Sequence, residues 1–254
     1  TVRIDRGAAW TQAVALYRKR DIPEGFVQIP GGPFISGGGD SAYETAVTRD
    51  VFFARFHVTC AEYLAFLNDL YTSDHDAARS RAPRENDRRR WIEERRRFRL
   101  PGPGEDKAYA WRPDWPVFAV SWFDAIAFAA WKSAREGRFY SLHHEDEYEK
   151  AARGVDGRLY PFGNHHEALW NHSAASLPGT RRPLPVGSFA TDVSPYGVRD
   201  ASGGAASWCL NAGETGSREM RLVRGIGWWS NDSGTGLTQR FGGSPGLVRA
   251  GYGL

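Results

Sequence analysis

The sequence predicts one α+β domain with two main helices, a small twisted antiparallel sheet and many loops. Two segments, residues 59–70 and 121–137, have the apolar spacing of amphipathic helices. Beyond Gly154, glycines and prolines interrupt almost every short apolar segment, which indicates short strands joined by turns. No internal repeat is visible, and strands and helices do not alternate as parallel βαβ units require.

The first strands are expected between residues 25 and 34. Apolar residues alternate over Phe26, Val27, Gln28 and Ile29, meet a turn at Pro30 and Gly31, and resume at Phe34. This pattern predicts an early hairpin.

The first long helix is expected over residues 59–70. Thr59 and Glu62 form the pattern of a capping box, in which each side chain binds the other residue's backbone N–H. One face of this helix then carries the apolar residues Tyr63, Phe66, Leu67 and Leu70.

A second helix is expected from Ser121, which with Asp124 repeats the capping pattern, to about Gly137. Its expected buried stripe consists of Trp122, Ile126, Ala129 and Ala130. A shorter third helix is expected over residues 144–153, where acidic residues at its start complement the positive end of the helix dipole.

Residues 79–115 form an insertion between the first two helices, and its first part, residues 79–99, is dense in arginine. Glu93 and Glu94 precede three arginines, so a helix here would neutralise part of its own charge. Two interpretations stay open. We favour a solvated, partly helical flap over a patch that binds phosphate or an acidic partner.

Composition narrows the class of protein. The chain has 254 residues, 41% of them hydrophobic, which is enough to bury one substantial core. Its formal net charge of +3 does not call for nucleic acid or an anionic membrane as a partner, and no apolar run is long enough to span a bilayer. Cys60 and Cys209 lie in apolar stretches, so we expect reduced, buried thiols in a cytoplasmic protein rather than a single disulfide.

Several short motifs follow one another in a characteristic order. They are Tyr160-Pro161-Phe162-Gly163, Pro185-Val186-Gly187, the segment 194–200 and Val223-Arg224-Gly225. With the acidic segment 142–154 before them, they resemble the formylglycine-generating-enzyme, or sulfatase-modifying-factor, family. The resemblance implies a C-type-lectin-like fold for residues 21–254.

The same resemblance implies that the family's oxidation chemistry is absent. That chemistry uses two cysteines near the C-terminus that bind copper, and the corresponding segment 232–240 contains no cysteine. Without a thiolate there is no soft ligand for Cu(I). We therefore expect no catalytic residues, no cofactor and no enzyme activity, and we interpret Cys209 as a core residue.

Metal binding by other residues is not favoured by the sequence. His143-His144 and His165-His166 are adjacent pairs, and sequence neighbours seldom direct two imidazoles at one ion. The family's calcium site uses side-chain oxygens at a turn that here consists of residues 203–208, Gly-Gly-Ala-Ala-Ser-Trp. Those oxygens are lost, although Asn171 could contribute to another site.

The C-terminal segment combines aromatic, hydroxyl and amide side chains with glycines, as binding surfaces do. The C-type lectin fold also carries the variable proteins of diversity-generating retroelements, whose C-terminal segment binds ligand. By that resemblance we expect a ligand-binding face composed of Trp229, Asn231, Ser233, Thr235, Thr238, Gln239, Phe241, Leu247, Arg249 and Tyr252. An inert scaffold is the alternative.

We therefore expect a non-catalytic module that recognises a protein or small-molecule ligand. Residues 1–20 resemble a linker or the tail of a preceding domain, as in members joined to a bacterial serine/threonine kinase. The competing class is a metal-dependent oxidase, or a related enzyme of the family, whose site has moved to the histidines.

Overall fold

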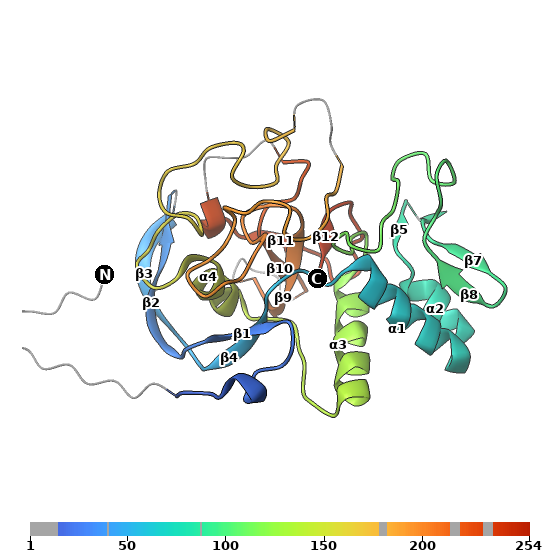
Figure 1. Cartoon of the computed structure of the whole chain (residues 1–254), viewed down its shortest axis with the longest axis horizontal. Coiled ribbons are helices and arrows are strands. Elements are labelled where there is room, and N and C mark those ends of the chain that lie inside the picture. Colours follow the sequence, from blue (N-terminus) through green and yellow to red (C-terminus); the bar gives the residue numbers. More distant parts are fainter. Residues whose placement is uncertain (1–14, 40, 87, 178–181, 214–218, 231–235) are drawn as a thin grey trace, which may run out of the picture.

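The structure is a computed structural model that describes residues 15–39, 41–86, 88–177, 182–213, 219–230 and 236–254. It confirms the α+β class, with helices and small sheets linked by long loops (Figure 1). In chain order the elements are η1 Lys19–Asp21, β1 Phe26–Ile29, β2 Gly32–Gly38, β3 Ser41–Thr48, β4 Val51–Ala54, α1 Cys60–Ser73, α2 His75–Arg81, β5 Arg84–Glu85, β6 Arg88–Arg89, β7 Ile92–Glu94, β8 Arg97–Arg99, α3 Trp122–Glu136, α4 Glu145–Arg153, β9 Ala206–Ala212, β10 Arg221–Arg224, η2 Gly236–Thr238, β11 Phe241–Gly243 and β12 Tyr252–Gly253.

The central sheet has the strand order β11-β10-β9-β12, and β12 runs parallel to β9 while the other pairs are antiparallel. The predicted hairpin between β1 and β2 is wrong, because β1 pairs with β4 and β2 pairs with β3. At the corner between them, the carbonyls of Pro30 and Gly32 accept hydrogen bonds from the buried ammonium of Lys150, at 2.6 and 3.0 Å. These bonds tie the corner to α4, so it does not act as the turn of a hairpin.

The three predicted helices are confirmed as α1, α3 and α4. At the start of α1 the backbone N–H of Glu62 donates to Thr59 Oγ1 over 3.3 Å, and Glu62 Oε2 accepts from the Thr59 N–H over 2.8 Å. Ser121 and Asp124 make the same exchange at the start of α3. Helix α3 ends at Gly137, whose φ of 62° is a left-handed conformation that glycine adopts without steric cost.

The buried stripe predicted for α3 is partly wrong. Ala129 is buried, but Ala130 is exposed and Trp122 and Ile126 are half-buried. The helix is packed on two sides: Phe128 stacks on Tyr63 of α1, while Ala125 faces the central sheet. A helix between two apolar neighbours buries a wider face than one simple stripe.

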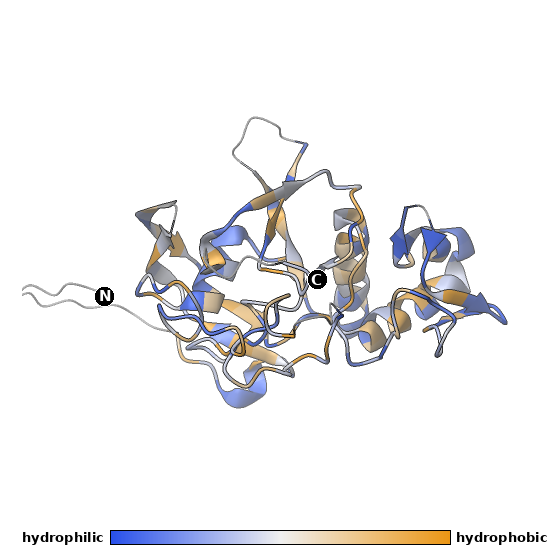
Figure 2. Cartoon of the chain, turned by 90° about the horizontal axis from the view of Figure 1, so that it is seen from above, coloured by the Kyte–Doolittle hydropathy of each residue, from blue (hydrophilic) through white to orange (hydrophobic). Residues whose placement is uncertain are grey.

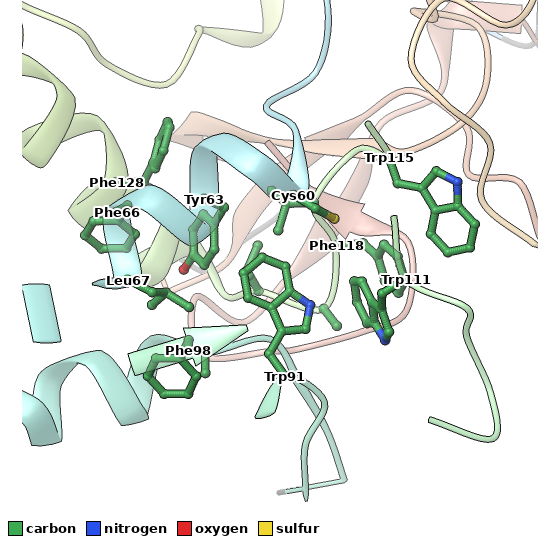
Figure 3. Packing of buried hydrophobic residues seen from close by; sticks show 14 of the residues in the cluster. Cys60, Tyr63, Phe66, Leu67, Trp91, Phe98, Trp111, Trp115, Phe118 and Phe128 are labelled. Atoms are coloured by element: carbon green, nitrogen blue, oxygen red, sulfur yellow. The ribbon is translucent and has the colours of Figure 1, made fainter. Parts of the chain in front are cut away.

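The insertion is not helical beyond α2, so the flap predicted there is wrong in its secondary structure. Two hairpins, β5–β6 and β7–β8, form a separate lobe at one end of the molecule (Figure 1). Trp91 and Phe98 are 3% and 1% exposed, and they belong to the same apolar cluster as Tyr63 and Phe66 (Figure 3). The residues along the hairpins of this lobe are mostly hydrophilic (Figure 2). Burial of these two aromatic rings fixes the hairpins on α1.

Among the residues that the structure describes, no helix has the length and apolar character needed to cross a membrane.

Candidate functional site at the C-terminal segment

The C-terminal segment lies on a buried base of three residues, Trp208, Arg224 and Trp228. Trp208 on β9 is fully buried, and its indole N–H donates to the carbonyl of Val120 over 3.0 Å. Trp228 is 3% exposed and packs edge-on against Phe118. All three side chains therefore belong to the interior of the protein and not to its surface.

Arg224 connects this base to the polypeptide above it. Its guanidinium and that of Arg153 both donate to the carboxylate of Glu149, and all three side chains are 1% exposed or less. Arg224 also donates to the carbonyls of Leu237 and Thr238, at 2.9 and 3.2 Å. Loss of one partner from such a buried ionic group leaves an uncompensated charge, so this group holds η2 firmly in place.

Trp229 is half-buried, and its surroundings indicate a structural role. The indole lies against Gly227 and Gly251, where a Cβ would come within 1.3 and 1.6 Å of ring carbons. The ring also contacts Trp228 and Tyr252, at centroid distances of 5.3 and 6.3 Å. Trp229 therefore fills a slot that exists because residues 227 and 251 have no side chain.

Two further residues of the expected binding face are buried, so the expectation that they are exposed is wrong. Thr238 is 4% exposed, because η2 is held down by Arg224. Tyr252 is 6% exposed, because β12 pairs with β9 and places the ring edge-on against Trp208. The role of Thr238 and Tyr252 in ligand binding stays a prediction, and their low solvent exposure does not support it.

The exposed members of the expected face are Phe241, Leu247 and Arg249. Phe241 is 37% exposed on β11, and Leu247 is 38% exposed in the loop that follows. Gln239 is half-buried beside them in sequence. Asn231, Ser233 and Thr235 lie outside the described residues.

Arg240 is a residue of this surface that the sequence analysis omitted. Its side chain is 39% exposed and pairs with Glu145 at the start of α4. Its position between Gln239 and Phe241 in the chain is the feature of the sequence that indicates a place on the same surface. We define the C-terminal surface as Gln239, Arg240, Phe241, Leu247 and Arg249.

The two thiols are free and buried. Burial raises the pKa of both well above the usual range of a thiol. Cys209 Sγ lies 3.5 Å from His143 Nε2, but desolvation lowers the pKa of that imidazole to about 3, so neither group is charged at neutral pH. A neutral pair of this kind lacks the thiolate that nucleophilic and copper chemistry require.

The histidine pairs are not brought together as a metal centre within the described part of the chain, where no three His, Cys, Asp or Glu side chains form a suitable group. His165 pairs with Glu167 at 2.7 Å, and His166 lies 3.0 Å from the Asn171 amide oxygen. Asn171 donates in turn to the Ser202 carbonyl, so both ends of its amide are engaged.

The turn at residues 203–208 is held by an imidazole. His57 Nδ1 lies 3.2 Å from both Ser207 Oγ and the carbonyl of Leu254, and its Nε2 lies 3.1 Å from the carbonyl of Asp200. The ring therefore lies within hydrogen-bond distance of three separate segments. With alanines at 205 and 206 and an imidazole beside Ser207, the residues present do not fit the family's calcium site.

Comparisons with known proteins agree with the fold and the motifs. The family model described as "Sulfatase-modifying factor enzyme 1-like domain" matches residues 11–253. "Inactive C-alpha-formylglycine-generating enzyme 2" of Bos taurus is 29% identical over 169 residues, which is 61% of this chain and 54% of that protein. "Formylglycine-generating enzyme" of Thermomonospora curvata is 26% identical over 255 residues, 84% of this chain and 74% of that one.

Two solved structures have the same fold. PvdO from Pseudomonas aeruginosa superposes with a TM-score of 0.69 and 21% identity, over 97% of each chain. Treponema denticola variable protein 1 superposes with a TM-score of 0.66 and 18% identity, over 90% of this chain and 92% of that one. The chain spans about half the length of the first curated relatives it matches, 54% and 44%.

Proposed function

The chain belongs to the sulfatase-modifying factor enzyme 1-like domain family, and from this premise we propose that it is a non-catalytic recognition module that binds a protein or small-molecule ligand. The ligand contacts the C-terminal surface. Relatives include a protein named as inactive and an enzyme, so family membership is compatible with either role.

The observation that carries the proposal is the contrast between base and surface. Trp208, Arg224 and Trp228 are buried, whereas Phe241, Leu247 and Arg249 of the C-terminal segment are exposed. A rigid support limits the backbone entropy that is lost on binding, and arginine is among the residues that most often dominate binding energy at interfaces. Treponema denticola variable protein 1 has the same fold, which supports the suitability of this fold for a binding role.

The absence of thiols from segment 232–240 supports the non-catalytic part of the proposal. We expect the protein, loaded with copper, to leave a sulfatase-type cysteine peptide unconverted, because neither Cys60 nor Cys209 is an accessible thiolate. Mass spectrometry of the peptide gives the readout. Formylglycine above a protein-free control would contradict the proposal.

Variation among closely related strains tests the binding surface. If the segment is diversified, substitutions should gather at Phe241, Leu247 and Arg249, while the buried Leu237 and Trp228 stay constant. Helix α3 provides the matched control segment of the same gene. Substitutions spread evenly over α3 and the C-terminal segment would count against a variable surface.

The enzyme alternative is tested on the purified protein. A stoichiometric content of iron or copper that is lost on substitution of His143 or His166 would favour a relocated metal site. Metal content that is unchanged in both variants removes that support.

A further inference from the structure

The arginine-rich lobe contains a hollow that the C-terminal surface does not use. It has a volume of about 690 Å³ and opens to solvent. Its lining residues come from α1 and from the hairpins β5–β6 and β7–β8, which lie together at one end of the molecule (Figure 1). Arginines at 88, 89, 95 and 96, glutamates at 93 and 94, and the rings of Tyr71 and Trp91 form its lining.

The two glutamates of the hollow are already neutralised. Glu93 accepts hydrogen bonds from the Tyr71 hydroxyl at 2.7 Å and from Arg79 and Arg89, at 2.7 and 2.9 Å. These partners lower the pKa of Glu93 to about 2, chiefly through Arg79. Glu94 accepts from Arg99 over 2.7 Å. Both carboxylates are therefore engaged with residues of the lobe itself.

Arg88, Arg95 and Arg96 are different. All three are exposed, and within the described residues none has a carboxylate within ion-pair distance. Three cationic groups thus line one hollow without an ion-pair partner among the described residues, while both glutamates of the lining, Glu93 and Glu94, are paired. The hollow presents a net positive charge to solvent.

The backbone that presents two of these arginines is unfavourable for them. Arg95 and Arg96 form the turn between β7 and β8 with φ of 49° and 63°. A two-residue hairpin turn with two positive φ values is best satisfied by Asn-Gly, since side chains with a Cβ resist the left-handed region. Within the described residues, neither side chain forms an ion pair that would offset the strain, which points to a role outside the folding of the hairpin.

The base below the turn is rigid. The side-chain amide of Asn68 on α1 makes two hydrogen bonds to β8. Its NH₂ group donates to the Phe98 carbonyl over 3.0 Å, and its oxygen accepts from the Phe98 N–H over 2.6 Å. The rings of Phe98 and Trp91 are buried in the core under α1 (Figure 3). The arginines are therefore displayed from a fixed hairpin rather than from a free loop.

We propose that this hollow binds an acidic polypeptide segment of a partner protein through Arg88, Arg95 and Arg96. Guanidinium groups match carboxylates in bidentate geometry, and three of them on two hairpins suit carboxylates spaced along a chain. A volume of about 690 Å³ is far more than one small inorganic anion fills. A formal net charge of only +3, with two glutamates inside the hollow, argues against the continuous basic track that a nucleic-acid backbone requires.

A substitution that favours the fold but removes the charges tests the proposal. In Arg95→Asn/Arg96→Gly the turn takes its preferred residues, so we expect an unchanged or higher melting temperature. The probe is a fluorescein-labelled peptide rich in Asp and Glu, followed by fluorescence anisotropy at low and physiological salt. We expect binding by the parent protein, weakened about tenfold or more in the variant and reduced by salt.

The matched control is Lys19→Ala/Arg138→Ala, which removes the same number of charges from exposed positions elsewhere. It should change peptide affinity less than about twofold, because it alters only the weak, screened field of the whole molecule. Equal affinities of the parent and the hairpin variant, equal losses in the two double variants, or no peptide binding at low salt would each overturn the proposal. A single-stranded oligonucleotide or inorganic phosphate that displaces the peptide and binds more tightly, with the same arginine dependence, would overturn the choice of an acidic polypeptide.

Discussion

Replacement of Trp229 by alanine decides whether this residue belongs to the binding face or to the core. The indole is half-buried in the slot between Gly227 and Gly251, and it contacts the rings of Trp228 and Tyr252. Truncation of a fully buried tryptophan costs about 3–5 kcal/mol, through lost transfer free energy and the cavity that remains. Since a minor part of the Trp229 side chain remains in contact with solvent, we expect Trp229→Ala to cost somewhat less, lowering the free energy of unfolding by about 2–3 kcal/mol.

Urea unfolding followed by far-ultraviolet circular dichroism measures this loss without relying on tryptophan fluorescence, which the substitution itself alters. Phe241→Ala is the matched control, because Phe241 is exposed at the sheet edge and should cost less than about 1 kcal/mol. A loss below about 0.5 kcal/mol for Trp229→Ala, with an unchanged denaturant slope, would refute the structural role. Trp229 would then return to the binding face.

Two further predictions concern the core. Burial, with a smaller contribution from Asp200, raises the pKa of Asp192 to about 8, whereas the pKa of an aspartate in the unfolded chain is about 3.9. Between these two pH values the native state keeps a proton that the unfolded state loses. The free energy of unfolding should therefore fall as pH rises from about 4 to 8. Asp192→Asn should remove most of that pH dependence. Urea unfolding at pH 5 and at pH 8 measures it, and an equal change in the free energy of unfolding between the two pH values in parent and variant would contradict the prediction. Ile126→Ala should cost about 1–2 kcal/mol, below the range for a fully buried isoleucine, because Ile126 is half-buried against the sheet; a cost above about 3 kcal/mol in the same melts would show that its face of α3 is more deeply packed.

The local rules written in the sequence determined the helices and their ends. Thr59 with Glu62, and Ser121 with Asp124, satisfy the first backbone N–H groups of a helix by themselves, so α1 and α3 begin where the residues predict. Gly137 ends α3 for an equally local reason. The motifs between Tyr160 and Arg224 indicated the family, because they follow one another in the order that is characteristic of it.

Pairing and burial were decided by tertiary structure. The sequence could not show that Lys150 binds the carbonyls at the β1–β2 corner, since these residues lie more than a hundred positions apart. In the same way, Trp229 is partly buried because Gly251, which is distant in sequence, has no side chain and leaves room for the indole ring.

The arginine-rich lobe shows the same division. Charge periodicity favoured a helix over Glu93 to Arg97, because it describes only neighbours along one element. The hairpin forms instead because Phe98 and Trp91 reach the core under α1, and Asn68 then binds the edge of β8. The sequence by itself determined which residues are apolar, which cap a helix and which thiols are missing from the family's catalytic segment. Only the tertiary structure decided which side chains share a core and which remain in solvent, because those contacts join positions that no local pattern connects.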